Sequence, residues 1–211
     1  MLRFLLLVSL TCPAWPSLLD RVAITVANDV VTELQVDEEL RVVGFLNRQP
    51  IKRDLTARRE AADRLVDQLI IKREMELSHY PMPSAEDVNA YLQKVKGNYP
   101  APESFERQLS AYSLSEPTLK EHLTLQLTTL RFIELRFRPD ADVSEADIET
   151  YYSRELSTWS ATHSGNPPTL AASREAIRQT LLDERTNEVL DTWLEESRKQ
   201  LNIVYLDKAL Q

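Results

Sequence analysis

Residues 115–137 read SEPTLKEHLTLQLTTLRFIELRF and carry the strongest helix signal in the chain. Pro117 stands in the first turn, where the N–H that proline lacks would have no helical partner. Apolar residues then recur three or four positions apart, a spacing that places them on one helix face. We expect Leu123 and Leu127 to be fully buried, and Phe132, which lies off this face, indicates burial on a second side. The stripe consists of Leu119, Leu123, Leu127, Leu130, Ile133 and Phe137.

Similar apolar spacing on both sides of this stretch predicts a mainly helical chain. Thr32 and Gln35 have the spacing of a capping box, and Ser84 is a residue type preferred at helix starts. We expect Gly44 and the residues up to Pro50 to end the first helix, because Gly and Pro interrupt helices. The predicted helices run from Thr32 to Gly44, over 56–77, from Ser84 to Gly97, around 105–112, over 115–137, over 144–156 and over 173–200.

Two short β-prone segments lie near the ends of the chain, VAITV at residues 22–26 and NIVYL at residues 202–206. Val and Ile favour strands, and neither segment is long enough to persist alone. Residues 27–29, Ala-Asn-Asp, indicate a turn because Asn and Asp tolerate left-handed backbone. We expect the two segments to pair in a small two-stranded sheet that joins the N- and C-terminal parts of a mainly α fold.

The composition argues against several functional classes. The chain has 211 residues, a net charge of -8 and three glycines that lie far apart, Gly44, Gly97 and Gly165. P-loops and dinucleotide-binding turns need clustered glycines, so we expect no nucleotide cofactor. The acidic balance offers no basic stripe to neutralise phosphates, so we expect no nucleic-acid partner.

Residues 1–17 have the pattern of an export signal. Arg3 supplies a positive charge, residues 4–10 form an apolar run, and Pro13 and Pro16 end any helix. The run is shorter than the roughly 20 residues of a membrane-spanning helix, so we expect no stable membrane insertion once the signal is removed. The alternative is a buried N-terminal helix. Signal removal would also take away Cys12, the single cysteine of the chain.

No catalytic or metal site is predicted from the chemistry-bearing residues. The histidines, His79, His122 and His163, lie far apart, and Glu76 with His79 lacks the second Glu-x-x-His pair of a bundle metal site. We expect His122 to lie on the solvated edge of its helix. The acidic residues 37–39, Asp-Glu-Glu, are expected to be a solvated run.

Apolar and aromatic residues gather next to the predicted helix breaks. In one interpretation they cover the core beneath the loops, as most apolar stripes do. In the other they line a groove between helices that accepts varied peptides, because Met and aromatic side chains adapt to different partners. The candidate peptide-binding residues are Phe45, Leu46, Tyr80, Met82, Tyr99, Tyr112 and Leu114.

The order of segments resembles a known family. Residues 20–33 (DRVAITVANDVVTE) and 62–71 (ADRLVDQLII) resemble the N-terminal region of SurA-like periplasmic chaperones. Residues 143–152 (VSEADIETYY) look like the helix that precedes the parvulin domain in SurA, PrsA and related PpiC-type foldases. Residues 177–206 are similar to the C-terminal helix and strand that return to the N-terminal module.

The resemblance implies a multi-helical, SurA/trigger-factor-like peptide-binding module over residues 18–211, made of an N-terminal helical part (18–156) and a C-terminal helix and strand (173–211). Residues 157–172 are expected to be a loop where the family carries its parvulin domain, so prolyl isomerase activity is not expected.

The function implied is that of an ATP-independent chaperone outside the cytoplasm, in the periplasm or an equivalent compartment, that holds non-native polypeptides such as outer-membrane protein precursors. Two alternatives stay open: a dedicated interaction or dimerising subunit of the cell envelope, and an isomerase-family protein with a residual foldase role. A homodimer is compatible with each of these functions.

Overall fold

Most of the chain that the structure covers is helical. The computed structural model describes residues 20–140, 142–162 and 167–210, so the predicted signal at 1–17 and His163 lie outside the described residues. None of the described helices is long and apolar enough to cross a membrane. The elements are β1 (Val22–Val26), β2 (Asp29–Thr32), α1 (Glu33–Asn47), α2 (Leu55–Leu77), α3 (Ala85–Gly97), α4 (Pro102–Ala111), α5 (Glu116–Arg136), α6 (Glu145–Thr162), α7 (Leu170–Gln200) and β3 (Ile203–Tyr205).

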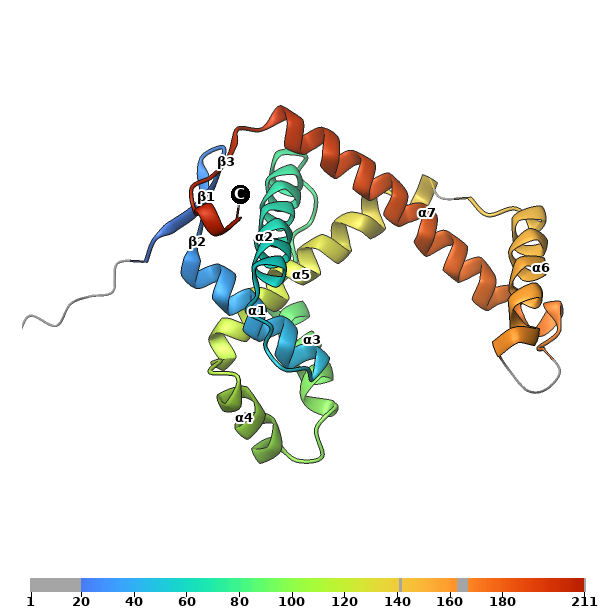
Figure 1. Cartoon of the computed structure of the whole chain (residues 1–211), viewed down its shortest axis with the longest axis horizontal. Coiled ribbons are helices and arrows are strands. Elements are labelled where there is room, and N and C mark those ends of the chain that lie inside the picture. Colours follow the sequence, from blue (N-terminus) through green and yellow to red (C-terminus); the bar gives the residue numbers. More distant parts are fainter. Residues whose placement is uncertain (1–19, 141, 163–166, 211) are drawn as a thin grey trace, which may run out of the picture.

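These elements form a body and an arm (Figure 1). The body contains the sheet, α1 to α5 and the C-terminal half of α7, which lies against α2. The arm consists of α6 and the N-terminal half of α7, which pack on each other. The single long helix α7 therefore connects the two parts, and α6 lies at the end of the arm that is far from the sheet.

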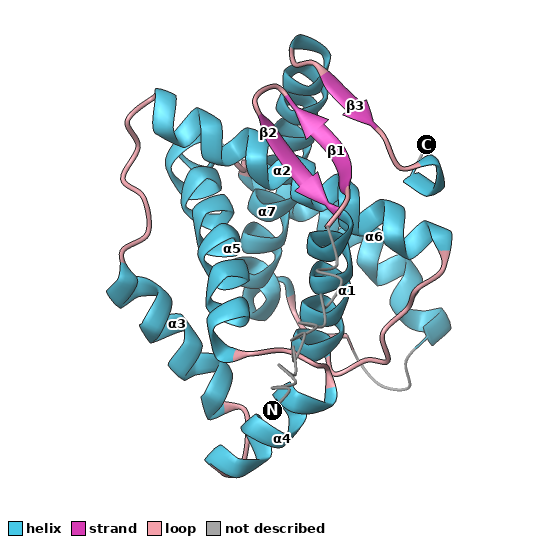
Figure 2. Ribbon diagram, turned by 90° about the vertical axis from the view of Figure 1, so that its left-hand side faces the viewer, coloured by secondary structure: helices cyan, strands magenta, loops and turns pink. Residues whose placement is uncertain are grey.

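The sheet ties the two ends of the described chain together. Its order is β2-β1-β3, both pairs are antiparallel, and it lies against α2 (Figure 2). The predicted pairing of the terminal segments is confirmed, since Thr25 faces Val204 and Val26 faces Ile203. The prediction of two strands is wrong, because the turn after β1 returns Val30 and Val31 along its other edge.

The first helix runs further than its sequence suggests. The capping box of Thr32 and Gln35 is present as expected. However, α1 continues through Gly44 to Asn47 and is capped by Arg48, whose φ of 54° is left-handed. A Cβ on Gly44 would lie 3.0 Å from Cε1 of Tyr112. Gly44 therefore permits close packing inside the helix and does not end it.

The buried face of the central helix α5 changes along its length, so that its N-terminal and C-terminal halves bury different sides. Leu123 is fully buried as predicted, whereas Leu127 is only half-buried and Leu130 is exposed. Thr128 and Phe132 are buried in their place, and the Thr128 hydroxyl donates to a main-chain carbonyl one turn earlier. The burial shifts because the N-terminal part of α5 packs on α1, α3 and α4, and its C-terminal part packs near α2 and α7.

The predicted loop at 157–172 is largely helical. Helix α6 continues to Thr162, and α7 begins at Leu170, capped by the Thr169 side chain. Leu156 and Trp159 continue the apolar spacing of α6, which explains its greater length. The start of α6 agrees with the sequence, since Ser144 and Asp147 exchange cap hydrogen bonds.

Candidate functional site

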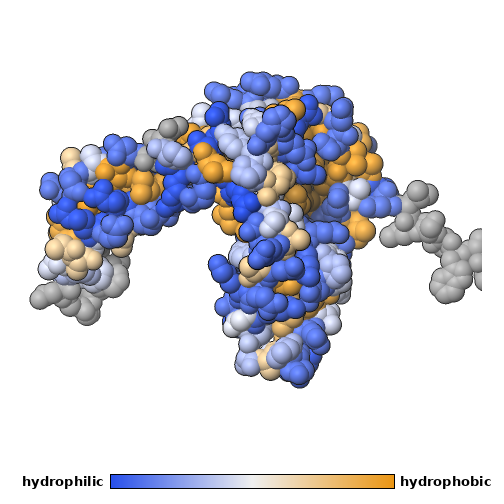
Figure 3. Space-filling view, turned by 180° about the vertical axis from the view of Figure 1, so that it is seen from behind, coloured by the Kyte–Doolittle hydropathy of each residue, from blue (hydrophilic) through white to orange (hydrophobic). Residues whose placement is uncertain are grey.

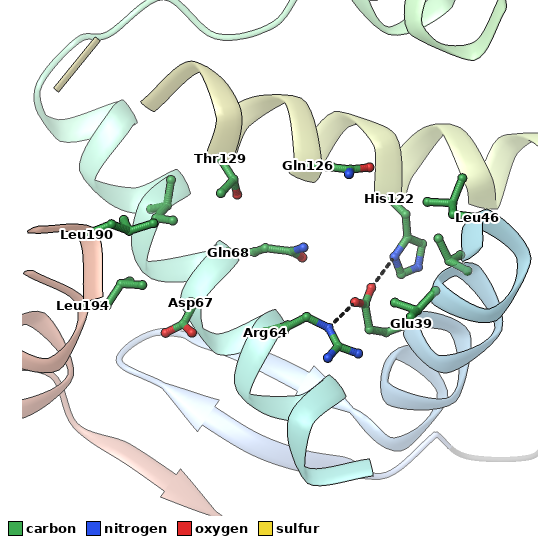
Figure 4. A pocket seen from close by; sticks show the side chains of 13 residues that line it. Glu39, Leu46, Arg64, Asp67, Gln68, His122, Gln126, Thr129, Leu190 and Leu194 are labelled. Atoms are coloured by element: carbon green, nitrogen blue, oxygen red, sulfur yellow. Dashed lines mark hydrogen bonds and ion pairs between the residues drawn. The ribbon is translucent and has the colours of Figure 1, made fainter. Parts of the chain in front are cut away.

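A pocket of about 350 Å³ lies where α1, α2, α5 and α7 meet (Figure 4). We call it the four-helix pocket. Seven polar side chains line it: the uncharged Gln68, Gln126 and Thr129, together with Glu39, Arg64, Asp67 and His122. The rest of its wall is mostly aliphatic and comes from Val42, Val43, Leu46, Ile71, Leu190 and Leu194.

A buried charge network forms one side of the four-helix pocket. Glu39 on α1 is only 4% exposed. Its Oε1 accepts a hydrogen bond of 2.9 Å from Nε of Arg64 on α2, and its Oε2 lies 3.1 Å from Nδ1 of His122 on α5. Because an ionised carboxylate only accepts hydrogen bonds, Nδ1 is the donor. Three helices are thus joined at one carboxylate.

This network corrects two sequence predictions. Glu39 does not belong to a solvated run, and His122 does not lie on a solvated edge, because both side chains are buried between helices. The spacing of these residues in the sequence could have indicated that they are buried. Glu39 lies three residues after Val36, and His122 three residues after Leu119, so each shares a face with a buried apolar residue.

The surroundings of Glu39 lower the pKa of its carboxyl group. Burial by itself raises this pKa, but the hydrogen bonds from His122 and Arg64, and the electrostatic attraction of both groups, outweigh it. Glu39 is therefore held as a carboxylate, and the Arg64 side chain is partly exposed.

A second network fastens the end of the chain to α2. Nε of Arg198 donates to Oδ1 of Asp67 over 2.8 Å, and the Tyr205 hydroxyl donates to Oδ1 of Asp63 over 2.5 Å. Burial raises the pKa of Asp67 despite its hydrogen bond from Arg198. Asp67 also lines the four-helix pocket, so the two networks flank it.

One polar atom at the four-helix pocket is unsatisfied. Oε1 of Gln68 is buried and has no hydrogen-bond partner among the described residues. The Gln68 side chain extends from α2 into the space between the four helices (Figure 4). A buried acceptor without a partner is costly, which makes this atom the natural anchor for a ligand.

Two further pockets lie along α7. The elbow pocket, of about 540 Å³, is formed by the end of α5 and by α7, with Phe137, Val189 and Trp193 in its wall. The tip pocket, of about 270 Å³, lies between α6 and α7 and includes Tyr152 and Trp159. Hydrophobic residues are visible on the surface along the arm and at its junction with the body (Figure 3).

The seven candidate peptide-binding residues fall in four places. Phe45, Tyr99, Tyr112 and Leu114 pack together with Phe105, a group that we call the aromatic cluster. The Phe45 ring lies 6.0 Å from that of Tyr99 and 5.9 Å from that of Tyr112. Of these four candidates, all but Tyr99 are buried, so in this conformation they serve the core.

Of the other three candidates, Leu46 packs against the same buried cluster, and Tyr80 and Met82 lie elsewhere. Tyr80 packs edge-on against Phe132 at 6.2 Å. Met82 is exposed between α2 and α3, and Leu46 lines the four-helix pocket. The structure does not bring the seven together in one groove, and their role in peptide binding stays a prediction.

The described residues contain no group of three or more His, Cys, Asp or Glu that could hold a metal ion. Glu76 and His79 are both exposed, at the end of α2 and just after it.

No protein-family model matches the chain, and no curated protein matches it.

Proposed function

We propose that the protein is an ATP-independent chaperone that works outside the cytoplasm and holds extended segments of non-native polypeptides, such as outer-membrane protein precursors. The observation that carries this proposal is the arm, which leaves the body with the elbow pocket at its base and the tip pocket near its end (Figures 1 and 3). The resemblance of residues 20–33 and 143–152 to SurA-like chaperones supports it.

The elbow pocket has the chemistry to accept an apolar segment. Val189 is 53% exposed there, beside Trp193 and Phe137. Glu188 and Glu196 also line this pocket. Exposed apolar surface bordered by polar groups is typical of protein-binding sites.

As a holding chaperone, the protein would act on unfolded chains by mass action. A protein that binds unfolded chains lowers their free concentration and so slows their aggregation. Each segment should bind weakly, with a Kd on the order of micromolar, because a mobile peptide loses entropy when it is ordered.

The proposal does not include prolyl isomerase activity. Residues 163–169 are all that separates α6 from α7. A four-stranded catalytic domain does not fit in that interval, since strands alone average about five to six residues each.

A second candidate function is that of a dedicated interaction subunit. It is favoured by the sheet, whose outer strands β2 and β3 each have an edge that no described strand covers. Val30 and Val204 are exposed on these strands, on either side of Thr25. Such an edge can accept a strand from another chain.

Light scattering tests the holding function. The protein, purified after expression of the full chain, should slow the aggregation of several unrelated unfolded clients. Val189→Gln should weaken this effect, whereas Leu55→Gln, at a still more exposed position at the start of α2, should not. Failure to protect any client at several-fold excess would contradict the holding function.

Two parallel measurements separate the alternatives. In a proline-limited refolding reaction, the protein should leave the slow phase unchanged; acceleration would show isomerase activity. Sedimentation should show little dependence on concentration in the absence of clients. Concentration-dependent self-association without client protection would favour the interaction subunit.

A further inference from the structure

The charged groups around the four-helix pocket already have partners within the described protein. Both oxygens of Glu39 accept hydrogen bonds, from Arg64 and His122. Asp67 is paired with Arg198. The two carboxylates are therefore already satisfied and offer nothing to a cation, and the aliphatic part of the lining favours a neutral ligand over an anion.

The unsatisfied oxygen of Gln68 indicates that the ligand carries a hydrogen-bond donor. Oε1 of Gln68 is buried and lacks a partner among the described residues, whereas the Thr129 hydroxyl already donates to the Leu125 carbonyl. A ligand that carries one N–H or O–H donor would satisfy Gln68 and leave the rest of its surface for aliphatic contacts.

The size of the four-helix pocket limits the ligand. An apolar cavity of about 150 Å³ already admits benzene. With about 350 Å³, the four-helix pocket has room for a fused two-ring molecule. Its apolar side chains come from α1, α2 and α7, so such a molecule would contact several helices of the body at once.

We propose that the four-helix pocket binds a small, neutral, apolar molecule with a single hydrogen-bond donor, of the indole or phenol class, and that this donor bonds to Oε1 of Gln68. This site is separate from the elbow and tip pockets, and its occupation does not require that the protein be a chaperone. A bound molecule would also stabilise the folded protein, because it binds the native state only.

Two matched probes test the donor. Indole carries an N–H, and 1-methylindole has nearly the same shape without it. Calorimetric titration of the full chain should show indole binding about threefold to tenfold more tightly, the range expected for one hydrogen bond. Equal affinities, or no binding of either probe up to millimolar concentration, would overturn the proposal.

Variants test the anchor. Gln68→Leu should abolish the preference for indole, and Gln93→Leu, at an exposed position of α3, should keep it. Loss of the preference in Gln126→Leu, with retention in Gln68→Leu, would show that the assigned anchor is wrong. Circular dichroism checks that each variant folds, and the comparison of the two probes on the unaltered protein needs no variant.

Discussion

The body and the arm are held together by different forces. In the body, large side chains such as Phe45, Phe132 and Leu123 are completely buried between helices. In the arm, the buried apolar residues that the structure describes form one small cluster of Val143, Ile148 and Ile177. Apolar burial is the dominant stabilising contribution in folding, so the body is the more stable of the two.

Partly exposed ion pairs add to the contact between α6 and α7. Glu145 at the start of α6 pairs with Arg174 and with Arg178, and Asp147 pairs with Arg185 over 2.9 Å. Each such pair contributes only about 0–1 kcal/mol. We therefore expect the arm to open locally while the body stays folded, because regions with few buried contacts open at low free energy.

The strongest test of this difference is Phe45→Ala. Phe45 is fully buried within the aromatic cluster, so its truncation should lower the free energy of unfolding by about 3–5 kcal/mol. The measurement is urea denaturation followed by circular dichroism. Ile148→Ala is the matched arm variant, which should speed hydrogen exchange in α6 and leave the main transition in place. Equal shifts of that transition would show that arm and body unfold as one unit.

Within the body, the two leucines of α5 should differ. Leu123→Ala should cost about 2–5 kcal/mol, the range for a fully buried leucine. Leu127 is only half-buried, so Leu127→Ala should cost about 1 kcal/mol. Denaturant midpoints of the two variants check this, and equal losses would contradict the burial of α5 described above.

The next largest effect on stability is expected from the C-terminal segment. Deleting residues 202–211 removes β3, the Tyr205–Asp63 hydrogen bond and the fully buried Leu210. For a loss of a few kcal/mol, Tm should fall on the order of 5–10 °C. Val204→Thr keeps the pairing at an exposed position and should shift Tm little. An unchanged Tm in the deletion would show that the sheet does not hold the body.

Glu39 should make the stability of the body depend on pH. Its pKa is below the ordinary 4.5, so its stabilisation is present above that value and is lost as the pH falls through the lower folded pKa. At pH 7, Glu39→Gln should cost about 1–3 kcal/mol, the value of hydrogen bonds to a charged group. The deficit should shrink below pH 4.5 in denaturation curves. Glu38→Gln leaves the hydrogen bonds of Glu39 in place, so this control should cost little at pH 7. A loss of stability in Glu39→Gln that grows at low pH would show that ionised Glu39 does not stabilise the body.

The smallest effect should come from the arm. Glu145→Gln removes exposed ion pairs with two arginines and should cost less than about 1 kcal/mol. Hydrogen exchange of the α6 amides should detect it at low salt, and about 1 M salt should erase the difference from the unaltered protein. A difference that persists at high salt would mean that Glu145 acts through packing.

Local rules in the sequence accounted for much of the fold. The caps at Thr32, Ser84 and Ser144 depend on side chains three residues away, so their spacing alone predicts them. The misplaced boundaries have a different cause. Gly44 was expected to end α1, yet Tyr112 from a distant segment occupies the space beside it.

The candidate site was much less predictable. Of the seven residues proposed for peptide binding, Leu46 is the one that lines the four-helix pocket. Phe45 and Tyr112 instead pack against each other, because apolar side chains beside helix ends look the same in sequence whether they face a core or a groove. Gln68 carries no pattern that marks it, since its unsatisfied oxygen depends on which helices surround it.

The sequence by itself determined the helices, their caps and the pairing of the terminal strands, because these depend on spacing along the chain and on the instability of single strands. Only the tertiary structure decided which polar groups are buried. Glu39 and His122 are 83 residues apart, and they meet because α1 and α5 both pack against α2 and contact each other. Burial and partnership of a charged group are set by residues brought together from distant segments, and the local pattern around each group does not contain that information.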